Sequence, residues 1–326
     1  MPDIREIFKH CIQVTVFDDG RIIPSRFTNE RLGYYWQQPR TPYALCPAGI
    51  TVEFYTDAEC ISFDLQMEYT YEKNYVFYTG IDVMENGEFT ETLLPPMFSY
   101  RNTYYLKNKG MTKICMYLPV GYNLTFKNFD LGNWKPVEET PSKMLLMAGD
   151  SIFQGLFGKN PMYAPVPILA RKYGLNYLNL SVGGEIHRGD YFEEGLKIQP
   201  DIVITELGTN DIGFVGDYDK ICRNIEEFYE SLCARYPDAK KISITPFHMT
   251  NYCTENPDAD RIEAMALKIR DKAFEVCKRL NIPVVDGRNI LPKNPALYAD
   301  VCHPNNEGFK VLIDNLSAEM EKFGII

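Results

Sequence analysis

The chain has 326 residues, of which 45% are hydrophobic and 24% charged, a balance typical of a globular protein long enough for two domains. Its 34 Lys and Arg against 44 Asp and Glu give a net charge of −10, which argues against nucleic acid or an anionic membrane as partner. No segment approaches membrane-spanning length, and the first residues lack the apolar block of a signal peptide. Nine cysteines without a C-x-x-C pair favour reduced thiols, so we expect a cytoplasmic protein.

Short, turn-rich strand patterns occupy residues 12–131. In "GITVEFYTDAECISFDLQM", the apolar residues Ile50, Val52 and Phe54 alternate with polar ones, and the alternation resumes over residues 61–65 after a turn. Alternation of this kind, repeated at short spacing and rich in Tyr, Phe and Thr, is typical of half-buried strands. The pattern predicts an antiparallel, jelly-roll-like β-sandwich.

A different pattern follows the polar, Pro-containing stretch at 132–143, which we interpret as a linker. Apolar strand-like stretches now alternate with helical spacings, as at 221–232 and 262–280. Five strands joined by crossover helices predict a three-layer α/β/α domain with a doubly wound parallel sheet. We therefore expect a sandwich domain over 1–137 and an α/β domain over 138–326. The five predicted strands are 143–149, 175–182, 201–208, 241–247 and 282–287.

Polar and glycine residues follow these strands at the edge where a doubly wound sheet places its ligands. Each also has an ordinary structural interpretation as a turn, a helix cap or a loop residue. Their order, with one group after each of the first three strands and one near the C-terminus, favours a single shared crevice. The groups are Gly149-Asp150-Ser151, Gly183-Gly184, Gly208 with Asn210 and Asp211, and Asp300 with His303 and Pro304, the last of which is expected to open the final helix.

These residue types are the ones that acyl transfer requires. Ser151 has a nucleophilic hydroxyl, and His303 is the natural base because its ordinary pKa of about 6.5 lies near operating pH. Asp300 can accept the other imidazole N–H and fix the tautomer. The backbone N–H groups of Ser151 and Gly184 and the side-chain amide of Asn210 are candidate oxyanion donors.

The stretches "GDSI", "GG" after the second strand, "GTND" and "DVCHP" resemble the four blocks of the SGNH hydrolases, the GDSL-type esterases and lipases. The resemblance covers residues 144–322 and implies the roles just given for Ser151, His303, Asp300, Gly184 and Asn210; Ile152 replaces the usual leucine of GDSL. The first half resembles the β-sandwich that precedes the catalytic domain in acetyl-xylan-esterase-like SGNH proteins. Its Gly-x-Asp-Leu-Tyr signature is matched at Gly80 and Asp82, with Met84 in place of tyrosine.

Three further residues are candidate substrate contacts. His187 and His248 follow strands two and four, although exposed loop histidines are an equally good interpretation. Trp36, in the aromatic stretch "YYWQQPR", could stack on a sugar, although aromatic strand residues are more often part of a core. Cys302 is expected to be a packing thiol, and no His or Cys spacing suggests a metal, so neither a metal nor another cofactor is expected.

The combined pattern predicts a serine esterase that removes short acyl groups, acetyl above all, from a carbohydrate. Its partner would be a small acylated substrate such as an acetylated sugar or oligosaccharide, and a homo-oligomer stays open. Two alternatives remain: a lipid or thioester hydrolase on the same triad, and a glycan-binding protein on an SGNH scaffold that has lost activity.

Overall fold

The computed structural model describes residues 2–36, 40–69, 80–94, 100–138, 140–192, 196–248 and 259–326. They form two compact units: Met1–Pro141 together with Lys159–Met162, and Ser142–Gly158 together with Tyr163–Ile326. The domain boundary between 137 and 138 stays a prediction. Within the described residues, no helix has the length and apolar character needed to cross a membrane.

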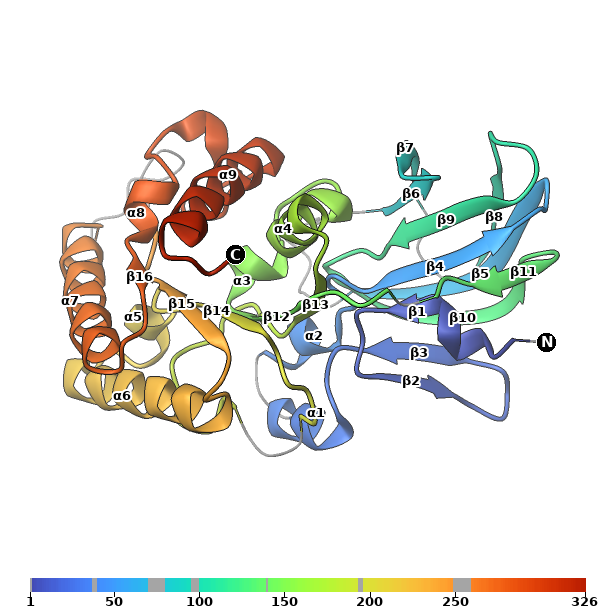
Figure 1. The fold of residues 1–326 in the computed structure, drawn as a ribbon. Coiled ribbons are helices and arrows are strands. Elements are labelled where there is room, and N and C mark those ends of the chain that lie inside the picture. The colour runs from blue at the N-terminus through green and yellow to red at the C-terminus, as the bar shows by residue number, and fades with distance from the viewer. Residues whose placement is uncertain are drawn as a thin grey trace. The chain divides into compact units, whose positions relative to one another are not determined.

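The first unit contains two antiparallel sheets, which confirms the predicted sandwich class (Figure 1). One sheet has the order β1-β4-β9-β6-β7, with β11 also paired to β4, and the other has the order β2-β3-β10-β5-β8. The strands are β1 Phe8–Lys9, β2 Gln13–Val16, β3 Ile22–Ser25, β4 Thr51–Thr56, β5 Cys60–Tyr69, β6 Ile81–Glu85, β7 Glu88–Leu93, β8 Tyr100–Tyr105, β9 Thr112–Tyr117, β10 Tyr122–Asp130 and β11 Trp134–Pro136. The helices are η1 Ile4–Ile7, α1 Asn29–Tyr35 and α2 Thr41–Leu45.

The alternating residues of β4 and β5 build the core of this unit. Val52 and Phe54 of β4 are fully buried, as are Ile61, Phe63 and Leu65 of β5. Successive side chains of a strand point to opposite faces, so the period of two read from the sequence places every second residue in the core. Each such side chain stabilises the fold by about 1.5–3 kcal/mol relative to an exposed one.

Two expectations for this unit were wrong. The stretch expected to be a linker contributes β11, which pairs with β4 through Trp134 opposite Thr56. Tyr34 and Tyr35 of the aromatic stretch lie in helix α1 and not in a strand, and the N-cap of α1, Thr28, accepts a hydrogen bond from the backbone N–H of Arg31.

The Gly80 and Asp82 positions have a physical explanation. A Cβ on Gly80 would lie 2.1 Å from the carbonyl oxygen of Leu93, so only glycine fits beside this strand. Asp82 is fully buried and accepts hydrogen bonds from the Thr92 hydroxyl at 2.6 Å, the Asn160 amide at 2.9 Å and the backbone N–H of Met162 at 3.0 Å. The carboxylate therefore fixes the segment Lys159–Met162 within this unit.

The second unit is built on a five-stranded parallel sheet of order β13-β12-β14-β15-β16, as predicted. Chain order across the sheet is thus 2-1-3-4-5, and its switch point lies between β12 and β14. The strands are β12 Met144–Gly149, β13 Asn176–Asn179, β14 Ile202–Glu206, β15 Lys240–Ile244 and β16 Val284–Val285. The helices are α3 Ser151–Gln154, α4 Pro165–Tyr173, α5 Asp211–Phe214, α6 Tyr218–Arg235, α7 Ala259–Arg279, α8 Gly287–Ile290, η3 Pro295–Leu297 and α9 Asn306–Lys322. The short η2 Pro161–Tyr163 begins in the first unit and ends at Tyr163 of the second.

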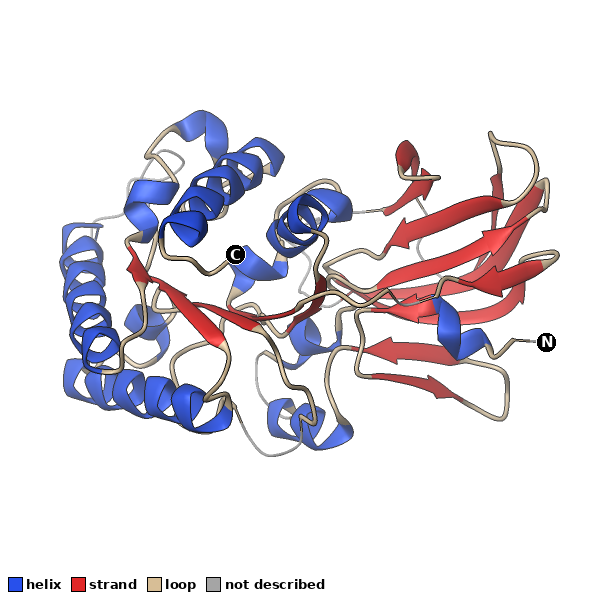
Figure 2. Ribbon diagram, in the orientation of Figure 1, coloured by secondary structure: helices blue, strands red, loops and turns tan. Residues whose placement is uncertain are grey.

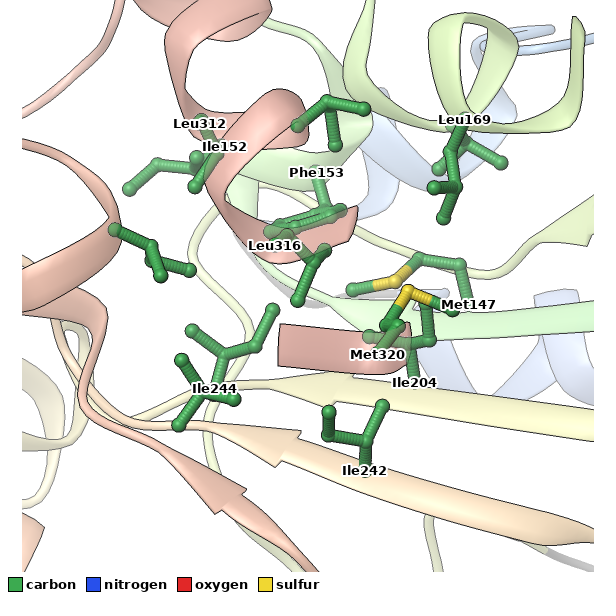
Figure 3. Packing of buried hydrophobic residues seen from close by; sticks show 14 of the residues in the cluster. Met147, Ile152, Phe153, Leu169, Ile204, Ile242, Ile244, Leu312, Leu316 and Met320 are labelled. Atoms are coloured by element: carbon green, nitrogen blue, oxygen red, sulfur yellow. The ribbon is translucent and has the colours of Figure 1, made fainter. Parts of the chain in front are cut away.

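Helices cover both faces of this sheet (Figure 2). On one face, Ile204 and Ile242 of the strands pack under Leu312 and Leu316 of α9, all four fully buried (Figure 3). On the other face, α6 buries the residues predicted from its helical spacing, and its Tyr229 hydroxyl hydrogen-bonds with Ser243 of β15. Helices therefore bury both faces of the sheet, as is usual for a parallel sheet.

Candidate active site

Ser151 lies at the point where β12 turns into α3. Asp150 is the N-cap of this short helix, and its side chain accepts a hydrogen bond from the backbone N–H of Ile152 at 2.9 Å. Gly155 ends the helix in the left-handed conformation, with φ of +91°. Ser151 is 9% exposed. The strand, the cap and the glycine together hold the serine at the carboxyl edge of the sheet.

Ser151, His303 and Asp300 form one hydrogen-bonded chain. Ser151 Oγ lies 2.8 Å from His303 Nε2, and His303 Nδ1 lies 2.8 Å from Asp300 Oδ2. Asp300 Oδ1 also accepts the backbone N–H groups of Cys302 at 2.9 Å and of His303 at 2.8 Å. The carboxylate thus orders the loop that carries the histidine. Pro304 does not open the last helix as expected: Asn305 is the N-cap, and α9 begins at Asn306.

The environment of the triad shifts the pKa values of His303 and Asp300. Burial lowers the pKa of His303, but the neighbouring Cys302 sulfur and the hydrogen bond and charge of Asp300 outweigh it and raise the pKa to about 10. Burial raises the pKa of Asp300, but the hydrogen bond and charge of His303 and two backbone N–H groups leave it below 3.8. The surroundings favour the imidazolium, the form that develops when a histidine accepts a proton.

Two hydrogen bonds tie the neighbouring loops to the serine turn. The Asn210 amide donates to Asp150 Oδ2 at 3.0 Å, and the backbone N–H of Gly183 donates to Gln154 Oε1 at 2.7 Å. Gly184, next in the chain, has φ of +80°, a conformation that favours glycine. The structure therefore brings the loops of Asn210 and Gly184 to the turn of Ser151.

A second carboxyl group lies beside the cap. Glu206, the last residue of β14, is fully buried, and its Oε2 accepts the backbone N–H of Asp150 at 3.4 Å. Burial raises the pKa of Asp150 to about 6. Burial, then the charge of Asp150, raises the pKa of Glu206 well above its ordinary value, so Glu206 is the protonated member of the pair.

The three residues expected to contact substrate, besides the triad and the oxyanion donors, differ in their surroundings. His187 is 1% exposed, and its Nδ1 lies 3.3 Å from Asp211, also buried. It is not an exposed loop residue, because it packs edge-on against Phe228 with ring centroids 5.2 Å apart, and its role as a substrate contact stays a prediction. His248 is half-buried, and burial and the charge of Arg288 lower its pKa. Trp36 is 63% exposed. Roles for His248 and Trp36 stay predictions.

Sequence reasoning missed two residues of this site and gave a third, Cys302, only a packing role. Phe157 stacks on the imidazole of His303, Glu206 lies behind Asp150, and Cys302 Sγ lies 3.4 Å from His303 Nδ1. Glu206 could have been noticed as an acid at the end of the apolar strand "DIVITE", since buried carboxyls are rare. Phe157 left no such signal, because its position depends on a backbone conformation that phenylalanine rarely adopts.

Residues 147–311, about half of the chain, match the model of the GDSL-like lipase/acylhydrolase family. A search of curated proteins returned no significant match. Among solved structures, a salicylyl-acyltransferase from a tetracycline biosynthetic pathway has a TM-score of 0.85 at 17% identity, covering 98% of this chain and 95% of that one.

Two carbohydrate esterases are also similar. A family two carbohydrate esterase from Clostridium thermocellum, in complex with cellohexaose, has a TM-score of 0.63 at 16% identity and covers 94% of this chain and 100% of that one. An acetyl xylan esterase from the rumen bacterium Butyrivibrio proteoclasticus has a TM-score of 0.59 at 16% identity, with coverage of 97% and 100%. At such identities the likeness shows a shared fold. The family match goes further and supports hydrolysis of esters: the chain belongs to the GDSL-like lipase/acylhydrolase family.

Proposed function

We propose that the protein is a serine esterase with Ser151 as nucleophile, His303 as base and Asp300 as the carboxylate that orients the base. The observation that carries this proposal is the hydrogen-bonded chain through the imidazole, with 2.8 Å on the serine side and 2.8 Å on the aspartate side. Both distances lie in the hydrogen-bond range, one between the nucleophile and its base and the other between the base and the carboxylate that orients it.

In this mechanism, Ser151 Oγ attacks the ester carbonyl while His303 Nε2 takes its proton. The oxyanion that forms accepts hydrogen bonds from the backbone N–H groups of Ser151 and Gly184 and from the Asn210 amide. His303 then protonates the leaving alcohol, and water removes the acyl group from Ser151 in a second round of the same steps. In the neutral ring, Asp300 keeps the proton on Nδ1, so that Nε2 is the atom that accepts the serine proton.

The substrate that we propose is a short acyl ester, above all an acetyl ester, on a carbohydrate. Support comes from the carbohydrate esterases of the same two-part fold. We extend the proposal to Trp36 and His248 as sugar contacts. Trp36→Ala should raise KM for an acetylated oligosaccharide and leave KM for a small chromogenic acetyl ester unchanged, since stacking requires a sugar ring. Equal effects on both substrates would remove Trp36 from the sugar site.

A second candidate function is transfer of the acyl group to an alcohol in place of water. The full-length similarity to an acyltransferase favours it, because the same acyl-enzyme serves both reactions. Product analysis with and without added alcohol or sugar acceptors distinguishes transfer from hydrolysis. Lipid or thioester hydrolysis on this triad, and glycan binding without catalysis, are the remaining candidate functions.

The deciding experiment measures rates on chromogenic esters from acetyl to long acyl, then on acetylated sugars. Ser151→Ala should abolish hydrolysis while the circular dichroism spectrum stays unchanged; Ser231→Ala, a serine of α6 outside the site, is the matched control. His303→Ala should be equally damaging, and Asp300→Asn less so. Wild-type rates in Ser151→Ala would overturn the mechanism, and a preference for long chains would overturn the acetyl assignment.

A further inference from the structure

The Nδ1 side of His303 carries a second set of polar atoms besides its bond to Asp300. Cys302 Sγ lies 3.4 Å from Nδ1, and the two Asp300 oxygens lie 3.0 Å and 2.8 Å from it. The sulfur, the nitrogen and a carboxylate oxygen all lie within 4.8 Å of one another. All three side chains are half-buried, so the cluster is reachable from solvent. Thiolate, imidazole and carboxylate are the three ligand types that zinc prefers.

The separations fit a tetrahedral ion. Zinc bonds of about 2.3 Å to sulfur and 2.0–2.2 Å to nitrogen and oxygen imply ligand separations of roughly 3.3–3.6 Å. The sulfur and nitrogen already stand at such a separation. The oxygen and nitrogen are closer, at 2.8 Å, because they share a hydrogen bond, and a small shift of the carboxylate would admit the ion. Water would complete the coordination.

We propose that Asp300, Cys302 and His303 form an inhibitory site for a soft or borderline divalent cation such as Zn²⁺. This inference rests on the proposed function of His303 as base. From the neutral ring that acts as base, binding releases one proton, from the Cys302 thiol, and the ring proton moves from Nδ1 to Nε2 as the metal–sulfur and metal–nitrogen bonds form. A neutral imidazole has one N–H, so the metallated ring carries it on Nε2, the atom that faces Ser151. That nitrogen can no longer accept the serine proton, and hydrolysis stops.

The test compares wild type with Cys302→Ser and Cys302→Ala, using Cys60→Ser as matched control because Cys60 is an exposed thiol in the other unit. Each protein is freed of metal with EDTA, which should leave full activity, and titrated with Zn²⁺ against its own uninhibited rate. Wild type and Cys60→Ser should be inhibited reversibly. The two Cys302 variants, each compared with its own metal-free rate, should need at least about tenfold more Zn²⁺ for half inhibition, as expected for a lost ligand.

A readout independent of activity separates this inference from the esterase proposal. Cd²⁺ added to wild type should produce the ultraviolet charge-transfer band of a cadmium thiolate. Part of this absorbance should come from Cys302, so it should be lower in both Cys302 variants and unchanged in Cys60→Ser. Equal Zn²⁺ sensitivity in wild type and both Cys302 variants, or an unchanged cadmium band in those variants, would overturn the site. Inactive, metal-free wild type that still shows the Cys302-dependent band would overturn the esterase proposal and leave the cation site standing.

Discussion

The ring of Phe157 stacks on the imidazole of His303, with centroids 4.0 Å apart and planes 21° from parallel. Phe157 does so from a backbone φ of +70°, a left-handed conformation that costs a residue with a Cβ roughly 1–2 kcal/mol. Such strain persists where surrounding structure imposes it and is found at functional sites. The ring covers one imidazole face, and an aromatic face attracts a cation.

We predict that Phe157→Leu lowers kcat with little change in KM. Leucine still fills the space but has no π face to stabilise the imidazolium that develops in the transition state. A cation–π contact of about 0.5–2 kcal/mol corresponds to a rate loss of roughly 2- to 30-fold. Phe157→Tyr keeps the ring and is the control expected to retain the wild-type rate. Equal kcat in the leucine variant and wild type would limit Phe157 to packing.

The strain at Phe157 gives a separate prediction for stability. Phe157→Gly and Phe157→Ala both remove the ring, but only alanine keeps the left-handed penalty, so the glycine variant should be more stable by about 1 kcal/mol in chemical unfolding. Phe274, in the interior of α7, is the matched control. There the order should reverse, with glycine about 1 kcal/mol less stable than alanine. Equal stability of Phe157→Ala and Phe157→Gly would mean that the backbone relaxes in the variants.

Asn210 and Asp150 should behave as one unit in catalysis. Asn210→Ala should reduce kcat by about 10²-fold or more, the scale for one oxyanion donor. Asp150→Ala frees the Asn210 amide and removes the cap of α3, so it should lose both kcat and about 0.5–2 kcal/mol of stability. Because Asp150 acts on the oxyanion through Asn210, the double variant should lose little kcat beyond the larger single loss. If the kcat loss of the double variant equalled the product of the two single losses, Asn210 and Asp150 would act separately.

The spacing of hydrophobic residues and the alternation of strands with helices made most of the α/β unit predictable from the sequence. All five strands of the parallel sheet lie where apolar stretches indicated them, because both faces of such a sheet are buried and its strands are continuously apolar. Ser151, Asn210 and the Gly184 turn could be grouped for a simple reason: the carboxyl ends of parallel strands share one edge. No contact had to be known in advance for that step.

What the sequence concealed depends on contacts distant in the chain or on local strain. Residues 34–35 have aromatic side chains that suit a strand, but the Thr28 cap places them in a helix. His187 follows a strand, as a pocket residue would, yet its partner Asp211 lies 24 residues away and draws it into the interior. Trp134 looked like part of a linker because a three-residue edge strand has too few residues to show a period.

The buried pair Asp150 and Glu206 predicts how stability changes with pH. The pKa of Glu206 in the folded protein lies well above its ordinary 4.5, so the folded state holds a proton that the unfolded chain releases. The stability that this group contributes is complete below pH 4.5 and is lost as pH rises toward the folded pKa, because the unfolded state is then favoured by ionisation. Asp150, with its pKa raised to about 6, acts in the same direction over a narrower range.

Glu206→Gln removes the ionisation at this position and keeps polar groups that can accept the Asp150 backbone N–H and donate to its carboxylate. We expect the Tm of this variant relative to wild type to increase steadily between pH 5 and pH 8, with each 1 kcal/mol corresponding to about 2–4 °C. Glu88→Gln, at an exposed position of β7, should show no such trend. Scanning calorimetry of the three proteins at a series of pH values is the measurement. A constant Tm difference for Glu206→Gln across that range would mean that Glu206 is ionised in the folded protein, and that a cation or a relaxed site stabilises its charge.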